Sequence, residues 1–154
     1  MKKSSLIKKI IFAIILIFVI IQFFDTDKNI SVAASENAIG KHYKVPDNVQ
    51  NLLKTSCYDC HSNNTAYPWY SNIQPVKWWL ADHVNSGKRH LNFDEFNTYT
   101  TKKKLHKLDE ITETINNGEM PLTSYTLIHS NAKLSSTDKS EIEKWVVQVK
   151  KEIN

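Results

Sequence analysis

Two cysteines and a histidine within five residues constrain this chain more than any other feature. The segment Cys57-Tyr58-Asp59-Cys60-His61 contains both cysteines of the 154-residue sequence. At this spacing two thiols can reach the two vinyl groups on one edge of a porphyrin, and the imidazole that follows directly can reach its iron. The segment therefore predicts one covalently bound haem c per chain, with thioether bonds at Cys57 and Cys60 and an iron ligand at His61.

Three other interpretations of the cysteine pair stay open. The first is a disulfide that closes a small loop, and the second is a dithiol redox centre, which is expected beside a βαβ pattern that this sequence lacks. The third is structural zinc, which would need two further ligands. The histidines available for that role are His42, His61, His83, His90, His106 and His129. Their spacing does not resemble that of a zinc finger, so the haem interpretation is favoured.

The excess positive charge of the chain lies at its N-terminus. The net charge is +4, and residues 1–24 contain four lysines and no acidic residue. Without those lysines the basic and acidic residues are equal in number, 16 each. A nucleic-acid-binding domain carries its excess positive charge on the folded part of the chain. We therefore expect no nucleic acid as a partner and assign the lysines to the flank of a membrane segment.

The apolar segment beside these lysines covers residues 10–24 and is interrupted only by Gln22. Lysines before such a segment stay on the cytoplasmic side of a membrane. Residues 1–24 are therefore predicted to form a single-pass transmembrane helix in the cytoplasmic membrane, with the following domain on the extracytoplasmic (periplasmic) side. The segment is short beside the about 20 apolar residues of a usual span. A secretory signal is the alternative, because small residues of the cleavage-site kind occur at 32–34.

The rest of the chain divides into a linker and one domain. Residues 25–44 are polar and without periodicity, which predicts a linker, and residues 45–154 are predicted to form the domain. Apolar residues recur in the domain at helical spacing, and strand-like alternation is absent. The predicted helices cover about 46–57, 75–87, 105–118 and 136–153. The predicted fold class is all-α, a small helical domain with long loops preceded by the transmembrane helix.

Several of these segments carry more specific predictions. The second helix is expected to bury an apolar face formed by Val76, Trp79, Leu80, His83 and Val84 and to end at Gly87. The loop before it is expected to pack through Tyr67, Trp69 and Tyr70. The buried face of the last helix is predicted to consist of Ile142, Trp145, Val146, Val149 and Ile153.

Residues 57–93 and 118–145 resemble a known family, the small membrane-anchored bacterial haem-binding domains related to single-haem c-type cytochromes. With the helix between them, these blocks cover roughly residues 45–150. The resemblance implies a covalent haem c in an α-helical, cytochrome c-like fold. The first helix departs from ordinary small cytochromes c, since it lacks a Gly or Ala followed four residues later by an aromatic residue. The crossing of the first and last helices is therefore not implied.

The second axial ligand of the iron is the open question of the site. The resemblance implies Met120, and a thioether is a soft donor that stabilises ferrous iron. Met1 is the only other methionine, so a thioether ligand from the domain must be Met120. His83 is the alternative, followed by His129 and by a position without a protein ligand. An open iron can bind a gas or activate peroxide, whereas two strong protein ligands favour electron transfer.

These observations favour an electron carrier over an enzyme. We expect a membrane-tethered monohaem cytochrome that passes single electrons to a redox partner protein and catalyses no bond-making reaction. A haem-based sensor with a displaceable distal ligand is the alternative. A peroxidase-like activity is less favoured, because the sequence offers no assigned acid–base group.

Overall fold

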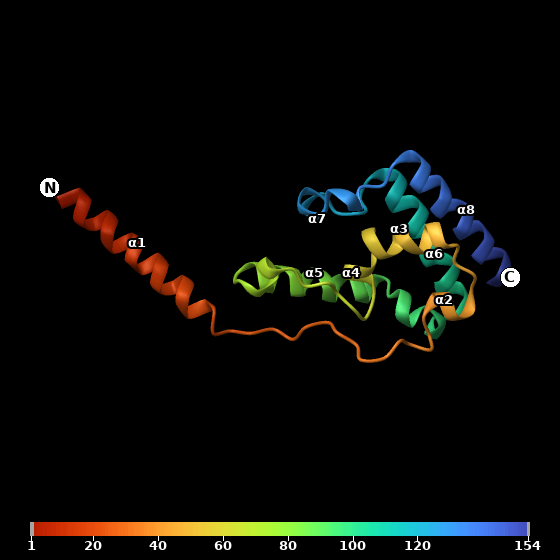
Figure 1. The fold of residues 1–154 in the computed structure, drawn as a ribbon, viewed down its shortest axis with the longest axis horizontal. Coiled ribbons are helices and arrows are strands. Elements are labelled where there is room, and N and C mark those ends of the chain that lie inside the picture. The colour runs from red at the N-terminus through yellow and green to blue at the C-terminus, as the bar shows by residue number, and fades with distance from the viewer. Residues whose placement is uncertain (1, 154) are drawn as a thin grey trace. The chain divides into compact units, whose positions relative to one another are not determined.

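The computed structural model describes residues 2–153, and every regular element in this part of the chain is a helix (Figure 1). The elements are α1 (Lys2–Ile21), α2 (Ile39–His42), α3 (Asp47–Ser56), α4 (Tyr58–His61), η1 (Trp69–Asn72), α5 (Val76–His90), η2 (Phe93–Thr98), α6 (Thr101–Asn117), α7 (Thr123–Ile128), η3 (Ser130–Ala132) and α8 (Ser136–Ile153), where η marks a 3-10 helix. One isolated antiparallel bridge joins Ile30 to Asn64. The all-α prediction is confirmed.

The described residues divide into two compact units. One consists of the residues up to Lys28 together with Ala66–His83, and the other consists of Asn29–Thr65 together with the residues from Val84 onward. The cysteine motif and Met120 belong to the second unit. His83 belongs to the first.

Helices α3, α6 and α8 build the core of the second unit. In that core α8 packs against both α3 and α6 (Figure 1). The buried face predicted for α8 is confirmed at Ile142, Trp145, Val146 and Val149, and Ile153 is partly buried beside it. Full burial of one large apolar side chain contributes about 1.5–3 kcal/mol. This packing holds α3 in place, and with it the cysteine motif that follows.

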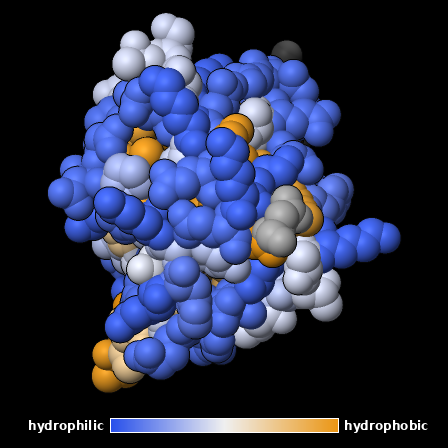
Figure 2. All heavy atoms as spheres, turned by 90° about the vertical axis from the view of Figure 1, so that its right-hand side faces the viewer, coloured by the Kyte–Doolittle hydropathy of each residue, from blue (hydrophilic) through white to orange (hydrophobic). Residues whose placement is uncertain are grey.

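One face of the described chain is mostly polar (Figure 2). The face shown in Figure 2 is largely hydrophilic, and hydrophobic side chains appear on it in small, separate groups.

The segment predicted as a linker contributes to the core at its end, where Ile39 of α2 is 1 % exposed. Tyr43, which follows α2, packs edge-on against Phe96 with ring centroids 6.1 Å apart.

The ends of the helices follow the sequence at most positions. Gly118 has a φ of 75° and ends α6 in the left-handed conformation that favours glycine, as predicted. The side chain of Asn92 accepts a hydrogen bond from the N–H of Asp94 and caps η2. The predicted end at Gly87 is wrong, because α5 continues to His90. Gly87 is instead an internal helix residue with a packing role described below.

The first unit contains α1 and the start of α5. The expected transmembrane helix is not found: among the residues that the structure describes, no helix combines the length and the apolar character that a membrane span needs. The apolar side chains of α1 are exposed on every side of the helix, from Leu6 to Ile20.

Trp69 is 76 % exposed, so the predicted packing of the loop through this side chain is wrong. Trp79 is 46 % exposed, so the predicted buried face of α5 is wrong at this position.

Candidate functional site

The cysteine motif occupies the junction between α3 and α4. Val49 and Leu53 of α3 are buried in the core and fix the approach to the motif. Cys57 lies between the two helices, and its carbonyl oxygen accepts hydrogen bonds from the N–H groups of Cys60 at 3.1 Å and His61 at 2.9 Å. Cys57, Cys60 and His61 therefore share one helical turn.

Both cysteines are free thiols that are partly exposed. Burial raises the pKa of the Cys57 thiol to about 12. Burial and, to a smaller extent, the Asp59 carboxylate raise the pKa of the Cys60 thiol to about 11. Both thiols are therefore neutral at pH 7, whereas a dithiol redox centre requires a lowered cysteine pKa. This electrostatic setting argues against the dithiol interpretation.

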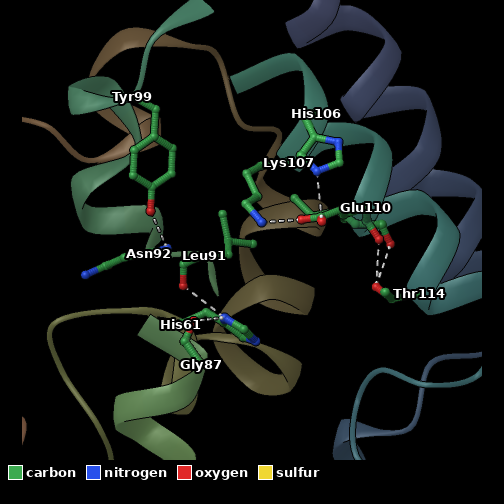
Figure 3. A network of polar contacts seen from close by, with 10 residues as sticks. His61, Gly87, Leu91, Asn92, Tyr99, His106, Lys107, Glu110 and Thr114 are labelled. Carbon is green, nitrogen blue, oxygen red and sulfur yellow. Dashed lines mark hydrogen bonds and ion pairs between the residues drawn. The ribbon is translucent and has the colours of Figure 1, made fainter. Parts of the chain in front are cut away.

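The imidazole of His61 is held by the end of α5. Its Nδ1 atom lies 3.0 Å from the carbonyl oxygen of Gly87 and 3.0 Å from that of Leu91 (Figure 3). Since a carbonyl oxygen only accepts hydrogen bonds, Nδ1 carries the proton and donates it to both. Burial lowers the pKa of His61, although the two carbonyl groups oppose the shift. His61 is thus a neutral imidazole whose Nε2 lone pair is available for a metal ion.

Gly87 lets α5 approach the motif closely. A Cβ atom at this position would lie 2.5 Å from the carbonyl oxygen of Cys60 and 3.1 Å from its Cβ atom. Any larger residue would therefore push α5 away from α4 and move the two acceptors of His61. Gly87 lies in the last turn of α5 and Leu91 directly follows the helix, at the end where carbonyl groups carry partial negative charge. A hydrogen bond of this kind makes an imidazole a stronger electron donor to a metal.

The loop after His61 is fixed by polar groups that are buried or partly buried, and sequence reasoning missed the contacts that these groups make with the loop. The N–H of Asn63 donates to Oδ2 of Asp94 at 2.7 Å, and Nδ2 of Asn92 donates to Oδ1 of Asn63 at 2.8 Å. Ser62 donates from Oγ to the carbonyl oxygen of Tyr58 at 2.7 Å. The polar run after the motif, and the capping pattern at Asn92, were the available signals. Together these bonds tie the motif to η2.

A second missed contact reaches the motif from α7. The hydroxyl group of Tyr125 donates to Oδ2 of Asp59 at 2.8 Å. The ring of Tyr125 stacks on His129 with centroids 4.4 Å apart. Asp59 stands between the two cysteines, so α7 is connected to the middle of the motif.

Met120 lies in the turn that follows α6. Its backbone N–H donates to the carbonyl oxygen of Thr114 at 3.1 Å, and its partly buried side chain packs against the core of the second unit. The structure brings Cys57, Cys60 and His61 together within one turn. The role of Met120 as second iron ligand stays a prediction.

The two alternative histidines have local partners. His83 donates from Nδ1 to the carbonyl oxygen of Trp79 at 2.8 Å, and its ring packs on the Trp79 ring with centroids 4.1 Å apart. Because a carbonyl oxygen is an acceptor, His83 is the donor in this bond. His129 lies over Tyr125, as described above. Among the described residues, no group of three or more His, Cys, Asp or Glu side chains is arranged to hold a metal ion, which is what a zinc site of these residue types would need.

The chain matches a known family of haem-binding domains. The model of a haem-binding domain family matches residues 16–148, which include the cysteine motif, Gly87 and Met120. Comparisons with curated proteins and with solved structures give no match.

Proposed function

This chain belongs to the haem-binding domain family, and from that premise we propose that it is a monohaem c-type cytochrome that transfers single electrons. It is a haem-binding protein by its family. The proposal concerns the covalent attachment, the iron ligands, the electron transfer and the place of the protein at a membrane.

The single observation that carries the proposal is the hydrogen bonding of the His61 imidazole. Its Nδ1–H is shared by the carbonyl oxygens of Gly87 and Leu91, so only Nε2 remains to bind iron. Histidines that bind metals characteristically donate their other ring proton to a carbonyl or carboxylate group. This hydrogen-bond arrangement supports the proposal that His61 is an iron ligand.

The two thiols beside His61 fit the remaining requirement of haem c. Cys57 and Cys60 would hold the porphyrin through thioether bonds, and neither thiol is engaged in a disulfide. Burial raises the pKa of both thiols, so they do not favour dithiol redox chemistry at pH 7. The donor set of this turn fits a covalently attached haem.

We assign the second axial position to Met120. The iron, when bound, supplies a one-electron couple, and a thioether ligand favours its reduced form. Met120 stands directly after the fixed turn at Gly118 and is held by its backbone bond to Thr114. With two protein ligands the site would carry electrons and catalyse no bond-making reaction.

We also propose that α1 attaches the protein to the cytoplasmic membrane, with the haem domain on the periplasmic side. From Ile14 to Ile17 every side chain of α1 is apolar and exposed. A helix that is apolar on all faces requires an apolar medium on all faces. Lys8 and Lys9 precede this stretch, which favours a cytoplasmic N-terminus.

Absorbance spectra of the haem-loaded chain test the central claim. The protein should be made in a host that attaches haem to C-x-x-C-H motifs and then denatured in acid and organic solvent. We expect the haem to stay with the polypeptide, and the Cys57→Ser, Cys60→Ser double variant to release it. Release of all haem from the parent protein would contradict the covalent attachment.

Carbon monoxide separates the two functional alternatives. An electron carrier with two firm protein ligands should show the same reduced spectrum with and without the gas. A changed spectrum would favour the sensor with a displaceable distal ligand, and it would contradict simple electron transfer.

A further inference from the structure

The first unit exposes a set of large aromatic and aliphatic side chains that the proposed electron transfer does not use, and we call this set the aromatic surface. This aromatic surface consists of Trp69, Ile73, Val76, Trp78 and Trp79, which are between 37 % and 76 % exposed. It spans η1, the turn after it and the first turn of α5. Three of the four tryptophans of the chain lie here, whereas the fourth, Trp145, is buried in the core.

The aromatic surface is joined to the end of α1 by a closed set of hydrogen bonds. Gln22 and Gln74 bind each other reciprocally, since Oε1 of Gln22 accepts from the N–H of Gln74 at 3.0 Å and Nε2 of Gln22 donates to the carbonyl oxygen of Gln74 at 3.3 Å. The Gln74 side chain donates to the carbonyl oxygen of Phe24 at 2.6 Å. It is 2 % exposed, so this junction is a built feature of the unit.

An ion pair also joins the residues after α1 to α5. Lys77 forms an ion pair with Asp25, directly after the apolar part of α1. The Oε1 atom of Gln74 also accepts from the N–H of Trp78 at 3.2 Å, which fixes the start of α5. The residues that follow α1 are therefore joined to the start of α5, which carries Trp78 and Trp79.

We propose that the aromatic surface docks into the headgroup region of the phospholipid bilayer at the point where α1 leaves it. Tryptophan combines an apolar ring with an N–H donor, and it concentrates where hydrocarbon meets headgroups. The apolar faces of α1 supply the neighbouring hydrocarbon-seeking element. The inference rests on the proposed attachment of α1 to a membrane.

Photolabelling from lipid tests this inference on the unmodified, haem-loaded chain. The protein is reconstituted in vesicles of phosphatidylethanolamine and phosphatidylglycerol that contain a phospholipid with a diazirine close to its headgroup. Mass spectrometry then locates the label. We expect label in α1 and in residues 69–79, at a level severalfold above that of the α8 segment around Val147, which is an exposed apolar control in the second unit.

Variants of the aromatic surface provide the matched comparison. In the Trp69→Ser, Trp78→Ser, Trp79→Ser chain, labelling of residues 69–79 should fall to the level of α8, while labelling of α1 and the haem spectrum stay unchanged. The single variant Trp69→Ser, at the most exposed of these side chains, should give a partial loss and guards against misfolding of the triple variant.

The outcomes distinguish this inference from the proposed function. Label in α1 but not in residues 69–79 of the parent protein would overturn the docking of the aromatic surface alone, and would point to a protein partner for it. Absence of label from α1 would overturn both the membrane attachment and the inference. Neither result touches the haem site, which is tested by the spectra above.

Discussion

Gly87 of α5 lies so close to Cys60 that a Cβ atom added to the glycine would sit 2.5 Å from the Cys60 carbonyl oxygen. The contact is between two backbones, so no flexible side chain can move aside. It places the end of α5, with both acceptors of His61, directly against the cysteine motif.

Replacement of Gly87 by alanine should therefore weaken the site. Overpacking costs about 1–3 kcal/mol, which is offset only in part by the about 1 kcal/mol that alanine adds to helix propensity. We expect a lower free energy of unfolding in urea and less haem per chain. Gly40→Ala is the matched control, because its Cβ atom would meet only Val45 at 3.8 Å. Equal stability of the two variants would contradict the close contact.

Replacement of Met120 by alanine should remove the distal ligand. The oxidised protein should lose the weak long-wavelength band of an iron–thioether bond, and its reduction potential should fall because a soft donor to ferrous iron is gone. His83→Ala and His129→Ala are the controls and should keep the band. If His83→Ala alone changes the spectrum, the ligand assignment to Met120 is wrong.

The turn before Met120 can be tested at Gly118. Its φ of 75° is accessible to glycine, whereas alanine in this region costs about 1–2 kcal/mol. Gly118→Ala should lower the free energy of unfolding by that order. Gly118→Asn should cost less, because asparagine tolerates the left-handed conformation. Nothing lies within 4 Å of a Cβ atom there, so a clash cannot account for the difference.

In the chain before haem attachment, the rate at which the two thiols are alkylated should rise at higher pH than for ordinary cysteines. Burial raises the pKa of Cys57 to about 12, and that of Cys60 to about 11. Only the thiolate reacts with iodoacetamide, so the rate of alkylation should keep rising about tenfold per pH unit beyond pH 9 in the folded chain. In urea the rate should level off near the ordinary cysteine pKa. Similar profiles in both conditions would contradict the buried setting.

The same shift has a consequence for stability. Because the folded chain holds these protons more tightly than the unfolded chain, the contribution of the thiols to stability is complete below the ordinary cysteine pKa and is lost as the pH rises toward 12. Urea unfolding of the haem-free chain between pH 8 and about pH 11 measures it. The Cys57→Ser, Cys60→Ser chain should lack this part of the pH dependence.

The sequence predicts the local parts of this protein well. The turn that unites Cys57, Cys60 and His61 depends on adjacent residues, and the buried face of α8 depends on a helical period, so both can be derived without a structure. Gly118 ends α6 for a reason that is equally local. Family membership supports the predicted haem, while the iron ligands stay predictions.

The parts that sequence reasoning missed depend on contacts between distant residues. A glycine near the end of a helical pattern usually marks its end. Gly87 is instead required by the close approach of α5 to the backbone of Cys60. The apolar period of α5 predicts burial of Trp79, yet no packed element covers that side chain within its unit. Asn63 and Asp94 meet only because η2 folds back onto the motif. Such pairings leave no periodic signal in the sequence.

The acceptors of His61 lie 26 and 30 residues further along the chain. In the unfolded protein either ring nitrogen of that histidine can carry the proton, and the two tautomers interconvert. Completion of α5 selects the tautomer whose lone pair is on Nε2. Iron binding and folding therefore favour one another thermodynamically, so a chain that has acquired its haem should resist unfolding more strongly than the same chain without it.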